Sequence, residues 1–363
     1  MLGTHSTSPI GIDVGARSIK AVQLAHGRRG TRIVAIALIE RQANTHMVGA
    51  AEATYLRSVL SRQGFRGSSI CLAAPAQRLL SGVMELPPRS SGAPMDHIAR
   101  VELARANSCS PEDIEMAWWE LPAGSRAVEG THVFAVGLRH EDAGSMLDGF
   151  EAAGFHARTL DAGALALARV GVAAKATAEG RLVGLVDIGW GGANLAVLLG
   201  RTLVYQRLLP EMGLSNLHKQ LVTQLSVDSE TAEFVVRKVG VDGDGLSGPQ
   251  AGELLDDARA VAAEHCDGLA TEIKASLSYA LRRYGASGAQ GVWVVGGGAC
   301  VPGYVERLRS GVSERVDALR TTDVACAPDD AIAGELAADP RLTCAAGLAM
   351  DGARMALPEV VPA

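Results

Sequence analysis

Short stretches of alternating apolar and polar residues predict β-strands, and they occur in the same arrangement twice along the chain. The first three strands are expected at residues 10–13, 19–25 and 32–40, and three more at 182–188, 194–199 and 202–209. In each copy the first strand ends in the pattern Asp-x-Gly, and a tight turn follows. Because this order recurs about half a chain apart, the sequence predicts two similar α/β lobes.

Elsewhere, apolar residues recur at intervals of three and four and predict helices. The longest extends from about residue 250 to 284, and the others are expected at 48–63, 95–107, 141–153, 158–174 (opening near Asp161), 213–225, 229–239, 302–315 and 343–355. Further strands are expected at 69–74, 79–86, 114–121, 131–138 and 291–295. The elements between residues 88 and 155 are predicted to form a small inserted α+β subdomain.

Composition favours a folded protein with two domains or one large bilobed domain. Of the 363 residues, 48 per cent are apolar and 20 per cent are charged, which is enough for a packed core. The formal net charge of −6 provides no basic surface for nucleic acid, so no nucleic-acid partner is expected.

The six cysteines are scattered and form no Cys-x-x-Cys pair, which argues against a disulfide framework or a zinc site and fits a reducing cytoplasm. No run of about 18 apolar residues predicts a membrane span. Residues 1–9 lack the basic and apolar parts of a signal peptide. We therefore expect a cytoplasmic protein that reaches a membrane only through a partner.

Three glycine-containing stretches are candidates for binding a nucleotide. Backbone N–H groups can approach phosphate closely where no side chain intervenes, and carboxylates facing a polyphosphate normally hold Mg²⁺ or its waters. Lys20, on the strand after the first turn, could neutralise phosphate. The glycines at 296–298 lie between a strand and a helix and could admit a base or sugar. The predicted nucleotide-binding residues are Asp13, Gly15, Ala16, Ser18, Lys20, Asp187, Gly189, Gly191, Gly192, Gly296, Gly297 and Gly298, with Asp13 and Asp187 holding Mg²⁺ through water.

Taken together, these stretches resemble those of the actin, heat-shock chaperone and sugar kinase superfamily, and in detail the PilM family of type IV pilus assembly proteins. The similar stretches are Gly11-Ile12-Asp13-Val14-Gly15, 18–24, Val186-Asp187-Ile188-Gly189, 295–303 and 344–349, together with the small insert. The resemblance covers residues 9 to 355. In PilM and its cell-division relative FtsA, such an insert replaces an actin subdomain.

This resemblance implies an α/β, actin-like (ribonuclease H-like) duplicated fold that binds ATP and Mg²⁺. The implied division is a first lobe at 9–86, 156–178 and 332–355, an insert at 87–155, a second lobe at 179–225 and 268–331, and a small nucleotide-covering subdomain at 226–267. It also implies a partner, the cytoplasmic N-terminal tail of a PilN-like inner-membrane protein, and contacts with other pilus assembly components. The protein would then lie at the inner face of the inner membrane. Self-association stays open.

Two departures from the family pattern favour weak or absent ATP hydrolysis. Family members usually carry a Glu two residues after an Asp in the connecting segment, where this chain has Asp161 and then Gly163. A polar group there would orient the attacking water, which glycine cannot do. The second turn carries Trp190, which would either crowd the terminal phosphate or point outward.

Some interpretations stay open from the sequence alone. Asp161 is either a catalytic residue that orients water or metal, or the N-cap of a helix. Trp118 and Trp119 are core residues or part of a docking surface. The alternative function is a small-molecule or sugar kinase of the same superfamily, but the chain shows no convincing extra Asp to serve as its general base.

Overall fold

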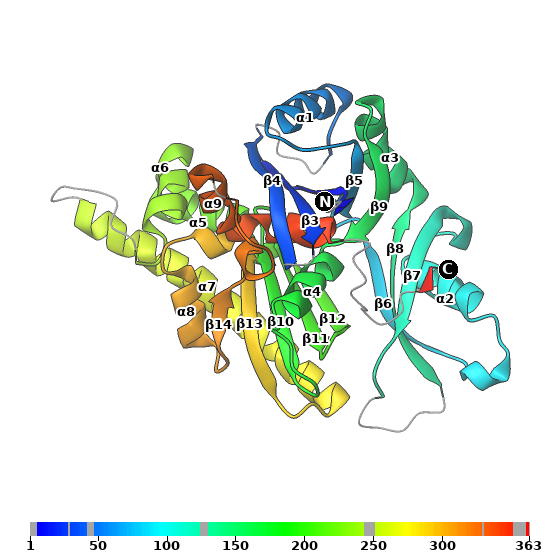
Figure 1. Cartoon of the computed structure of the whole chain (residues 1–363). Coiled ribbons are helices and arrows are strands. Elements are labelled where there is room, and N and C mark those ends of the chain that lie inside the picture. The colour runs from blue at the N-terminus through cyan, green and yellow to red at the C-terminus, as the bar shows by residue number, and fades with distance from the viewer. Residues whose placement is uncertain are drawn as a thin grey trace.

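Two central β-sheets with the same strand order, and a third smaller sheet beside them, make up the protein (Figure 1). We describe it from a computed structural model, in which residues 6–27, 30–41, 47–123, 130–242, 251–328, 330–350 and 361–362 are described. In Figure 1 the third sheet lies on the right, and the second central sheet lies below the first.

The first sheet has the strand order β4-β3-β2-β5-β9. Its strands are β2 (Ile10–Val14), β3 (Ser18–Gly27), β4 (Gly30–Glu40), β5 (Ser69–Ala74) and β9 (His156–Ala162). The first three strands pair antiparallel, and β5 and β9 run parallel to β2. The short β1 (Ser6–Thr7) pairs antiparallel with the end of β3, at Ala25 and His26. Helix α1 (Ala50–Arg62) leads from β4 to β5.

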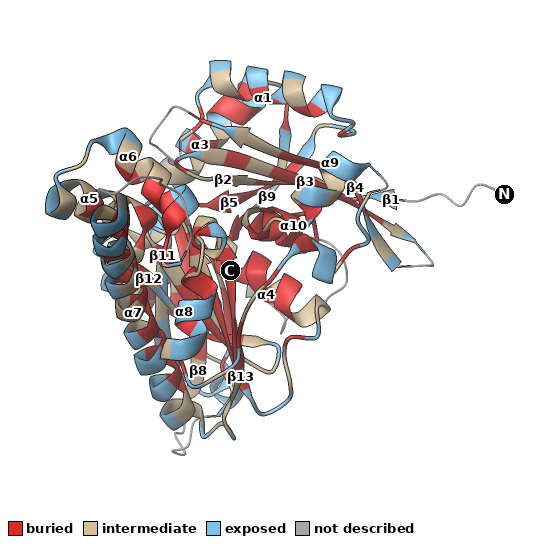
Figure 2. Ribbon diagram, turned by 90° about the vertical axis from the view of Figure 1, so that its left-hand side faces the viewer, coloured by how far each residue is buried: buried red, intermediate tan, exposed pale blue. Residues whose placement is uncertain are grey.

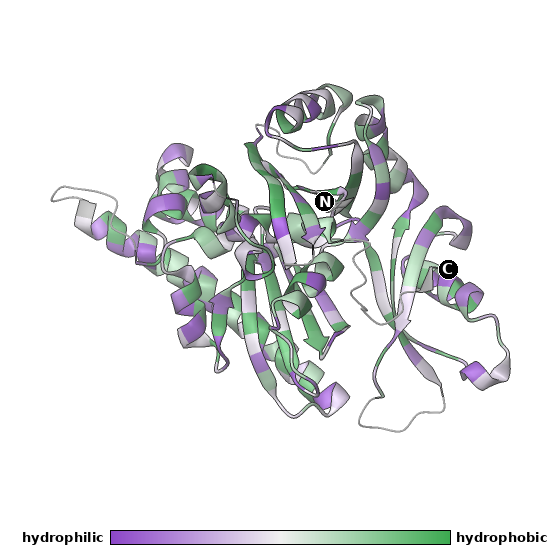
Figure 3. Ribbon diagram, viewed as in Figure 1, coloured by the Kyte–Doolittle hydropathy of each residue, from purple (hydrophilic) through white to green (hydrophobic). Residues whose placement is uncertain are grey.

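The second sheet repeats this topology as β12-β11-β10-β13-β14. Its strands are β10 (Leu182–Ile188), β11 (Ala193–Leu199), β12 (Thr202–Leu209), β13 (Ala289–Gly296) and β14 (Val316–Ala318). Again three antiparallel strands come first and two parallel strands follow. The predicted duplication is therefore present. Most of this sheet is apolar (Figure 3), since helices cover both of its faces.

The third sheet belongs to the insert and is antiparallel. It consists of β6 (Leu80–Leu86), β7 (Ile114–Glu120), β8 (Thr131–Arg139) and, from the end of the chain, β15 (Val361–Pro362), with helices α2 (Met95–Ala106) and α3 (His140–Ala152). Trp118 and Trp119 are both buried, so the core interpretation is correct. Trp118 donates to Asp96 of α2 at 2.8 Å. Trp119 stacks on Phe134 and donates to the Leu203 carbonyl of β12 at 2.8 Å, which joins the insert to the second lobe.

Two buried helices, α4 (Gly163–Ala173) and α10 (Thr343–Ala349), lie between the central sheets (Figure 2). They approach so closely that a Cβ at Gly347 would lie 2.1 Å from the Ala166 carbonyl oxygen, so only glycine fits there. α7 (Ala251–Tyr284) covers the opposite face of the second sheet from α4, and buries one of its sides (Figure 2).

The remaining helices lie outside the central layers. α5 (Leu214–Leu225), α6 (Ser229–Phe234) with a π-helical turn at Val235–Val239, and α8 (Tyr304–Gly311) lie around the second lobe, whereas α9 (Ala331–Ala337) packs against β4 of the first. Short 3₁₀ turns occupy Arg89–Ser91, Pro111–Asp113, Pro210–Met212, Gly297–Cys300, Thr321–Asp323 and Pro340–Leu342. None of the helices in the described ranges combines the length and the apolar character that crossing a bilayer requires.

Several expected elements differ from those observed. The helix predicted at 158–174 is wrong in its first part, because residues 156–162 form β9, which pairs with β5 far back in the chain. The helix predicted at 302–315 ends at Gly311, and the edge strand β14 follows. α9 was not predicted. The closing helix ends at Ala349, and the predicted residues 351–355 lie outside the described part of the chain.

Candidate nucleotide-binding site

Two β-hairpins, β2–β3 in the first lobe and β10–β11 in the second, have the same backbone geometry. In the first, the Gly15 N–H donates to the Ser18 carbonyl at 2.9 Å; in the second, the Gly189 N–H donates to the Gly192 carbonyl at 3.0 Å. In each, the aspartate two residues before the glycine lies at the end of the first strand. Both motifs found in the sequence therefore form closed turns of the same size.

Both hairpins line one cavity of about 450 Å³, a volume within the usual range for small-molecule sites. Eleven of the twelve predicted nucleotide-binding residues contribute to its wall: Asp13, Gly15, Ala16, Ser18, Lys20, Asp187, Gly189, Gly191, Gly192, Gly296 and Gly297. Gly298 is not part of the wall, and a Cβ there would lie 2.4 Å from the Ile188 side chain. The fold thus brings three distant glycine stretches to one place.

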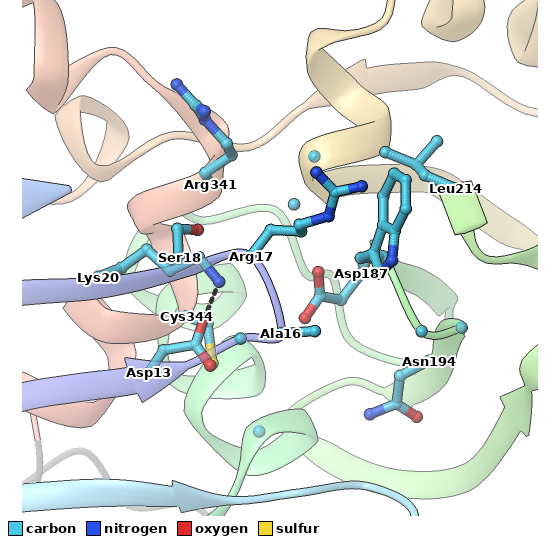
Figure 4. A pocket seen from close by; sticks show the side chains of 18 of the residues that line it. Asp13, Ala16, Arg17, Ser18, Lys20, Asp187, Asn194, Leu214, Arg341 and Cys344 are labelled. Carbon is cyan, nitrogen blue, oxygen red and sulfur yellow. Dashed lines mark ion pairs between the residues drawn. The ribbon is translucent and has the colours of Figure 1, made fainter. Parts of the chain in front are cut away.

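In the first hairpin, Asp13 and Lys20 face each other across the two strands and form an ion pair at 3.0 Å (Figure 4). Burial alone would lower the pKa of Lys20, but the carboxylates of Asp13 and Asp187 outweigh it and raise that pKa. Lys20 therefore stays charged and offsets part of the negative charge of the two acids.

In the second hairpin, Asp187 faces Asn194 instead of a lysine. Burial and the nearby Asp13 carboxylate raise the pKa of Asp187 to about 6, although Lys20 acts in the opposite direction. Gly296 (φ +80°) lies directly against this carboxylate, because a Cβ at Gly296 would be 2.2 Å from Asp187 Oδ1. The absence of a side chain at Gly296 therefore lets the turn that follows β13 approach the acid.

The turns present hydrogen-bond donors to the cavity. Within the described residues, the backbone N–H groups of Ala16, Arg17, Trp190 and Gly191 have no acceptor. Successive N–H groups of this kind form concave anion sites. The two turns therefore suit the phosphate groups of a nucleotide.

The residues at this site also fit a magnesium ion bound together with phosphate. Asp13 and Asp187 line the same cavity, and the Asp13 carboxylate contributes to the raised pKa of Asp187, which a nearby divalent cation would counteract. Mg²⁺ is usually held by one or two carboxylates together with phosphate oxygens and water. The described residues contain no cluster of three or more His, Cys, Asp or Glu that could hold a metal without a ligand's help.

Asp161 and Gly163 lie where β9 leads into α4, and they have different surroundings. Gly163, the first residue of α4, lines the cavity, whereas Asp161 does not. The Asp161 carboxylate is buried, forms an ion pair with Arg169 and accepts the Ala162 N–H at 2.8 Å. The N-cap interpretation of Asp161 is wrong, because Ala162 holds that position without a side-chain bond.

Sequence reasoning missed the residues that support the hairpins. Arg41 is buried, donates from Nη1 to the Gly15 carbonyl at 2.8 Å and pairs with Glu52 at 2.5 Å. Arg17 extends into the cavity, with its guanidinium carbon 3.8 Å from the centroid of the Trp190 ring. Trp190 therefore lines the cavity and does not simply point outward. No local pattern could have predicted these contacts, because the partners lie far apart in sequence.

Apolar side chains also contribute to the cavity wall. Leu214 lies beside Gly297, since a Cβ at Gly297 would be 3.2 Å from its side chain, and Val236 and Val301 also contribute to the wall. Such a surface suits the flat face of a base.

Comparison with known proteins identifies similar families and structures. The family model of type IV pilus assembly protein PilM matches residues 11–353. No match was found among curated protein sequences. A solved structure described as the PilM–PilN type IV pilus biogenesis complex is 21% identical, with a TM-score of 0.72 over 94% of this chain and 98% of the other.

A second solved structure is the ethanolamine utilization protein EutJ from Carboxydothermus hydrogenoformans. It is 16% identical, with a TM-score of 0.55 over 96% of this chain and 90% of the other. At these identities the likeness of the structures shows the fold alone, which is the predicted actin-like one.

Proposed function

The chain belongs to the family of type IV pilus assembly protein PilM, and on this premise we propose that it is a nucleotide-binding scaffold of type IV pilus assembly. The observation that carries the proposal is that two equivalent hairpins and the glycines Gly296 and Gly297 line one cavity. Fold alone would leave the function open.

The proposed ligand is ATP with Mg²⁺. The hairpin N–H groups hold the phosphates, Asp13 and Asp187 hold the metal through water, and Gly296 and Gly297 receive the nucleoside. The magnesium ion would neutralise phosphate charge when bound. The 450 Å³ cavity and the raised pKa of Asp187 support this assignment.

Hydrolysis is proposed to be slow. In the family, a carboxylate is expected where this chain has Gly163, and the structure gives Gly163 a place on the cavity wall. Asp161 is paired with Arg169 and does not line the cavity, so it is not available to replace that carboxylate. The protein therefore binds the nucleotide mainly as a structural or regulatory ligand.

The proposed partner is the cytoplasmic N-terminal tail of a PilN-like inner-membrane protein. This rests on family membership and on the similar structure described as a PilM–PilN complex. The protein would then work at the cytoplasmic face of the inner membrane through PilN and other assembly components. Its four parts would be those expected from the sequence: two lobes, the insert at 87–155 and the covering subdomain at 226–267.

Calorimetry with Mg·ATP tests the nucleotide site. Asp13→Ala and Asp187→Ala should each weaken binding about tenfold or more, because each removes a group that holds the metal. If both variants bind as tightly as the wild type, the site is misplaced. A purified protein that turns over ATP at about 1 s⁻¹ or faster would contradict slow hydrolysis.

A peptide test separates the scaffold from a kinase. The purified chain should bind a peptide from the cytoplasmic N-terminus of a PilN-like inner-membrane protein. It should not phosphorylate any sugar of a test panel. Sugar phosphorylation without peptide binding would instead support a small-molecule kinase. A scrambled peptide of the same composition is the control.

A further inference from the structure

One cation in the cavity connects three parts of the molecule. Arg17, in the first hairpin turn, stacks over the ring of Trp190 in the second turn, 3.8 Å from its centroid. Its Nη2 atom lies 3.3 Å from Oε2 of Glu233 on α6. Figure 4 shows the Arg17 side chain extending from the first hairpin toward the side of the cavity that carries Asp187 and Leu214. Arg17 thus connects the two hairpin turns with each other and with α6.

The contact with Glu233 is easily exchanged. The Arg17 and Glu233 side chains are 44% and 27% exposed, and exposed ion pairs contribute little to stability. Glu233 also pairs with Arg237 one turn later in the helix, at 2.8 Å, and Arg237 approaches Glu40 of the first lobe at 3.8 Å. If Arg17 moved, Glu233 would keep a cationic partner, so no buried charge would be left unpaired.

The other cation of the first hairpin is less free to bind phosphate. Lys20 is held by Asp13 and interacts with Asp187, which are the residues assigned to the metal. A guanidinium can bind a phosphate with two parallel hydrogen bonds, and it keeps its charge in any surroundings. Arg17 also lies beside the free N–H groups of both turns, where the end of a phosphate chain would lie.

Building on the proposed nucleotide site, we propose that Arg17 binds the outermost phosphate of a nucleoside triphosphate and thereby makes the site prefer ATP to ADP. Without a nucleotide, Glu233 and the face of Trp190 hold the guanidinium. The terminal phosphate replaces the Glu233 carboxylate as its partner. A diphosphate does not extend to Arg17 and leaves the pair with Glu233 in place.

Substitutions of Arg17 and of Glu233 should change the affinity for Mg·ATP in opposite directions. Arg17→Met removes the guanidinium group but keeps an unbranched side chain, and should weaken binding of Mg·ATP about tenfold while changing Mg·ADP binding less than about twofold. Glu233→Gln removes the competing carboxylate, and should tighten Mg·ATP binding about threefold. Isothermal titration calorimetry on the full chain with ATP and ADP measures both effects.

A matched control is available elsewhere in the chain. Arg315 also lies over a tryptophan, Trp293, at 5.3 Å, and pairs with Asp317, but it does not line the cavity. Arg315→Met should leave both affinities unchanged.

Tryptophan fluorescence gives an independent readout. Trp118, Trp119 and Trp293 are buried and do not line the cavity, whereas Trp190 does. Mg·ATP should change the fluorescence by displacing Arg17 from Trp190, and this response should disappear in Trp190→Phe and in Arg17→Met. Mg·ADP should give a much smaller change.

The outcomes separate this inference from the proposed function. If the wild type binds neither nucleotide, the nucleotide site itself is wrong and the role of Arg17 is wrong with it. If the wild type binds but Arg17→Met weakens ATP and ADP equally, or not at all, the assignment to the terminal phosphate is overturned while the site stands. If Glu233→Gln weakens ATP binding as Arg17→Met does, the pair is structural and no exchange takes place.

Discussion

Asp13-Val14-Gly15 and Asp187-Ile188-Gly189 occupy equivalent positions at the ends of β2 and β10, and comparing them shows which features the two hairpins share. The closing hydrogen bond of the turn is the same in both. The supports around the turns differ. The Gly15 carbonyl accepts from the Arg41 side chain, whereas the equivalent Gly189 carbonyl accepts from the Leu214 backbone N–H at the start of α5, at 3.0 Å. One turn depends on a side chain and the other on a helix terminus.

The residues opposite the two acids also differ. Asp13 faces Lys20, while Asp187 faces the neutral Asn194. Burial and the Asp13 carboxylate raise the pKa of Asp187 to about 6, and no cation lies directly opposite it in its hairpin. The duplication therefore gives one acid that is balanced within its hairpin and one that gains most from a cation in the cavity.

The largest effect is expected from removing the side-chain support of the first turn. Arg41→Met leaves the Gly15 carbonyl without its donor and Glu52 without its partner. Arg41 is buried and Glu52 is 30% exposed, so most of the cost comes from the Gly15 and Met47 carbonyls that lose their donor, at about 1–3 kcal/mol each. We expect the free energy of unfolding to fall by about 3 kcal/mol in urea denaturation, and Mg·ATP binding to weaken with it.

The control for this substitution is Arg307→Met. Arg307 also forms an ion pair, with Asp267, but both side chains are more than 40% exposed (43% and 47%). Its loss should leave the free energy of unfolding almost unchanged, because water and salt screen exposed ion pairs. Equal losses in both variants would mean that Arg41 provides no special support to the turn.

The next prediction concerns the unbalanced acid. Asp187→Asn should stabilise the nucleotide-free protein by about 3 kcal/mol at neutral pH, because ionising a group with its pKa at about 6 is disfavoured in the folded state. The same change should weaken Mg·ATP binding about tenfold or more. Thermal unfolding with and without nucleotide measures both effects, and a variant that is less stable in both conditions would contradict the argument.

The raised pKa of Asp187 also predicts how the free energy of unfolding depends on pH. Between about pH 4 and pH 6 the folded state holds a proton on Asp187 more tightly than the unfolded state does, so this group's contribution to stability falls as the pH rises. Above pH 6 that contribution is lost. The stability difference between the wild type and Asp187→Asn should therefore develop across this window and stay constant at higher pH.

A smaller effect is expected from supplying the acid that neither hairpin provides. Gly163 lines the cavity, and an added Cβ would meet only the Cys344 sulfur, at 3.7 Å, which is an ordinary contact. Gly163→Glu should raise the rate of ATP hydrolysis about tenfold, toward the lower end of what a positioned acid or base contributes. A steady-state phosphate assay measures the rate.

Gly163→Ala is the matched control, because it makes the same backbone change without the carboxylate. If both variants hydrolyse ATP at the rate of the wild type while Mg·ATP binding is retained, the missing acid is not what limits hydrolysis.

Both hairpins could be predicted from the sequence because their determinants are local. Alternation along about ten residues sets the strands, and Asp-x-Gly sets the turn, so eleven predicted residues meet at one cavity. β9 escaped prediction because it is an edge strand with polar residues such as His156 and Arg158, and its pairing with β5 joins segments distant in sequence. Leu160 and the apolar residues of α4 then give a helical spacing that continues through the boundary.

The supports of the site could not be predicted for a related reason. Arg17 contacts Trp190 and Glu233, which come from other parts of the fold. Asp161 has the local signature of a helix cap, yet it forms an ion pair with Arg169 inside the protein. For charged residues, the partner decides the role, and partners of this kind depend on the tertiary structure.

The smallest predicted effect tests the comparison most directly, by giving the second hairpin the residue of the first. Asn194 faces Asp187 as Lys20 faces Asp13. In Asn194→Lys the new ammonium group should lower the pKa of Asp187 and raise the stability of the nucleotide-free protein at pH 7 by about 1 kcal/mol. The fall in stability between pH 4 and pH 6 should shrink, and Mg²⁺ should bind less tightly. Asn194→Lys should bring no gain in stability when it is combined with Asp187→Asn, because the lysine then has no carboxylate opposite it. If the gain persists in the double variant, it does not come from an ion pair between residues 194 and 187.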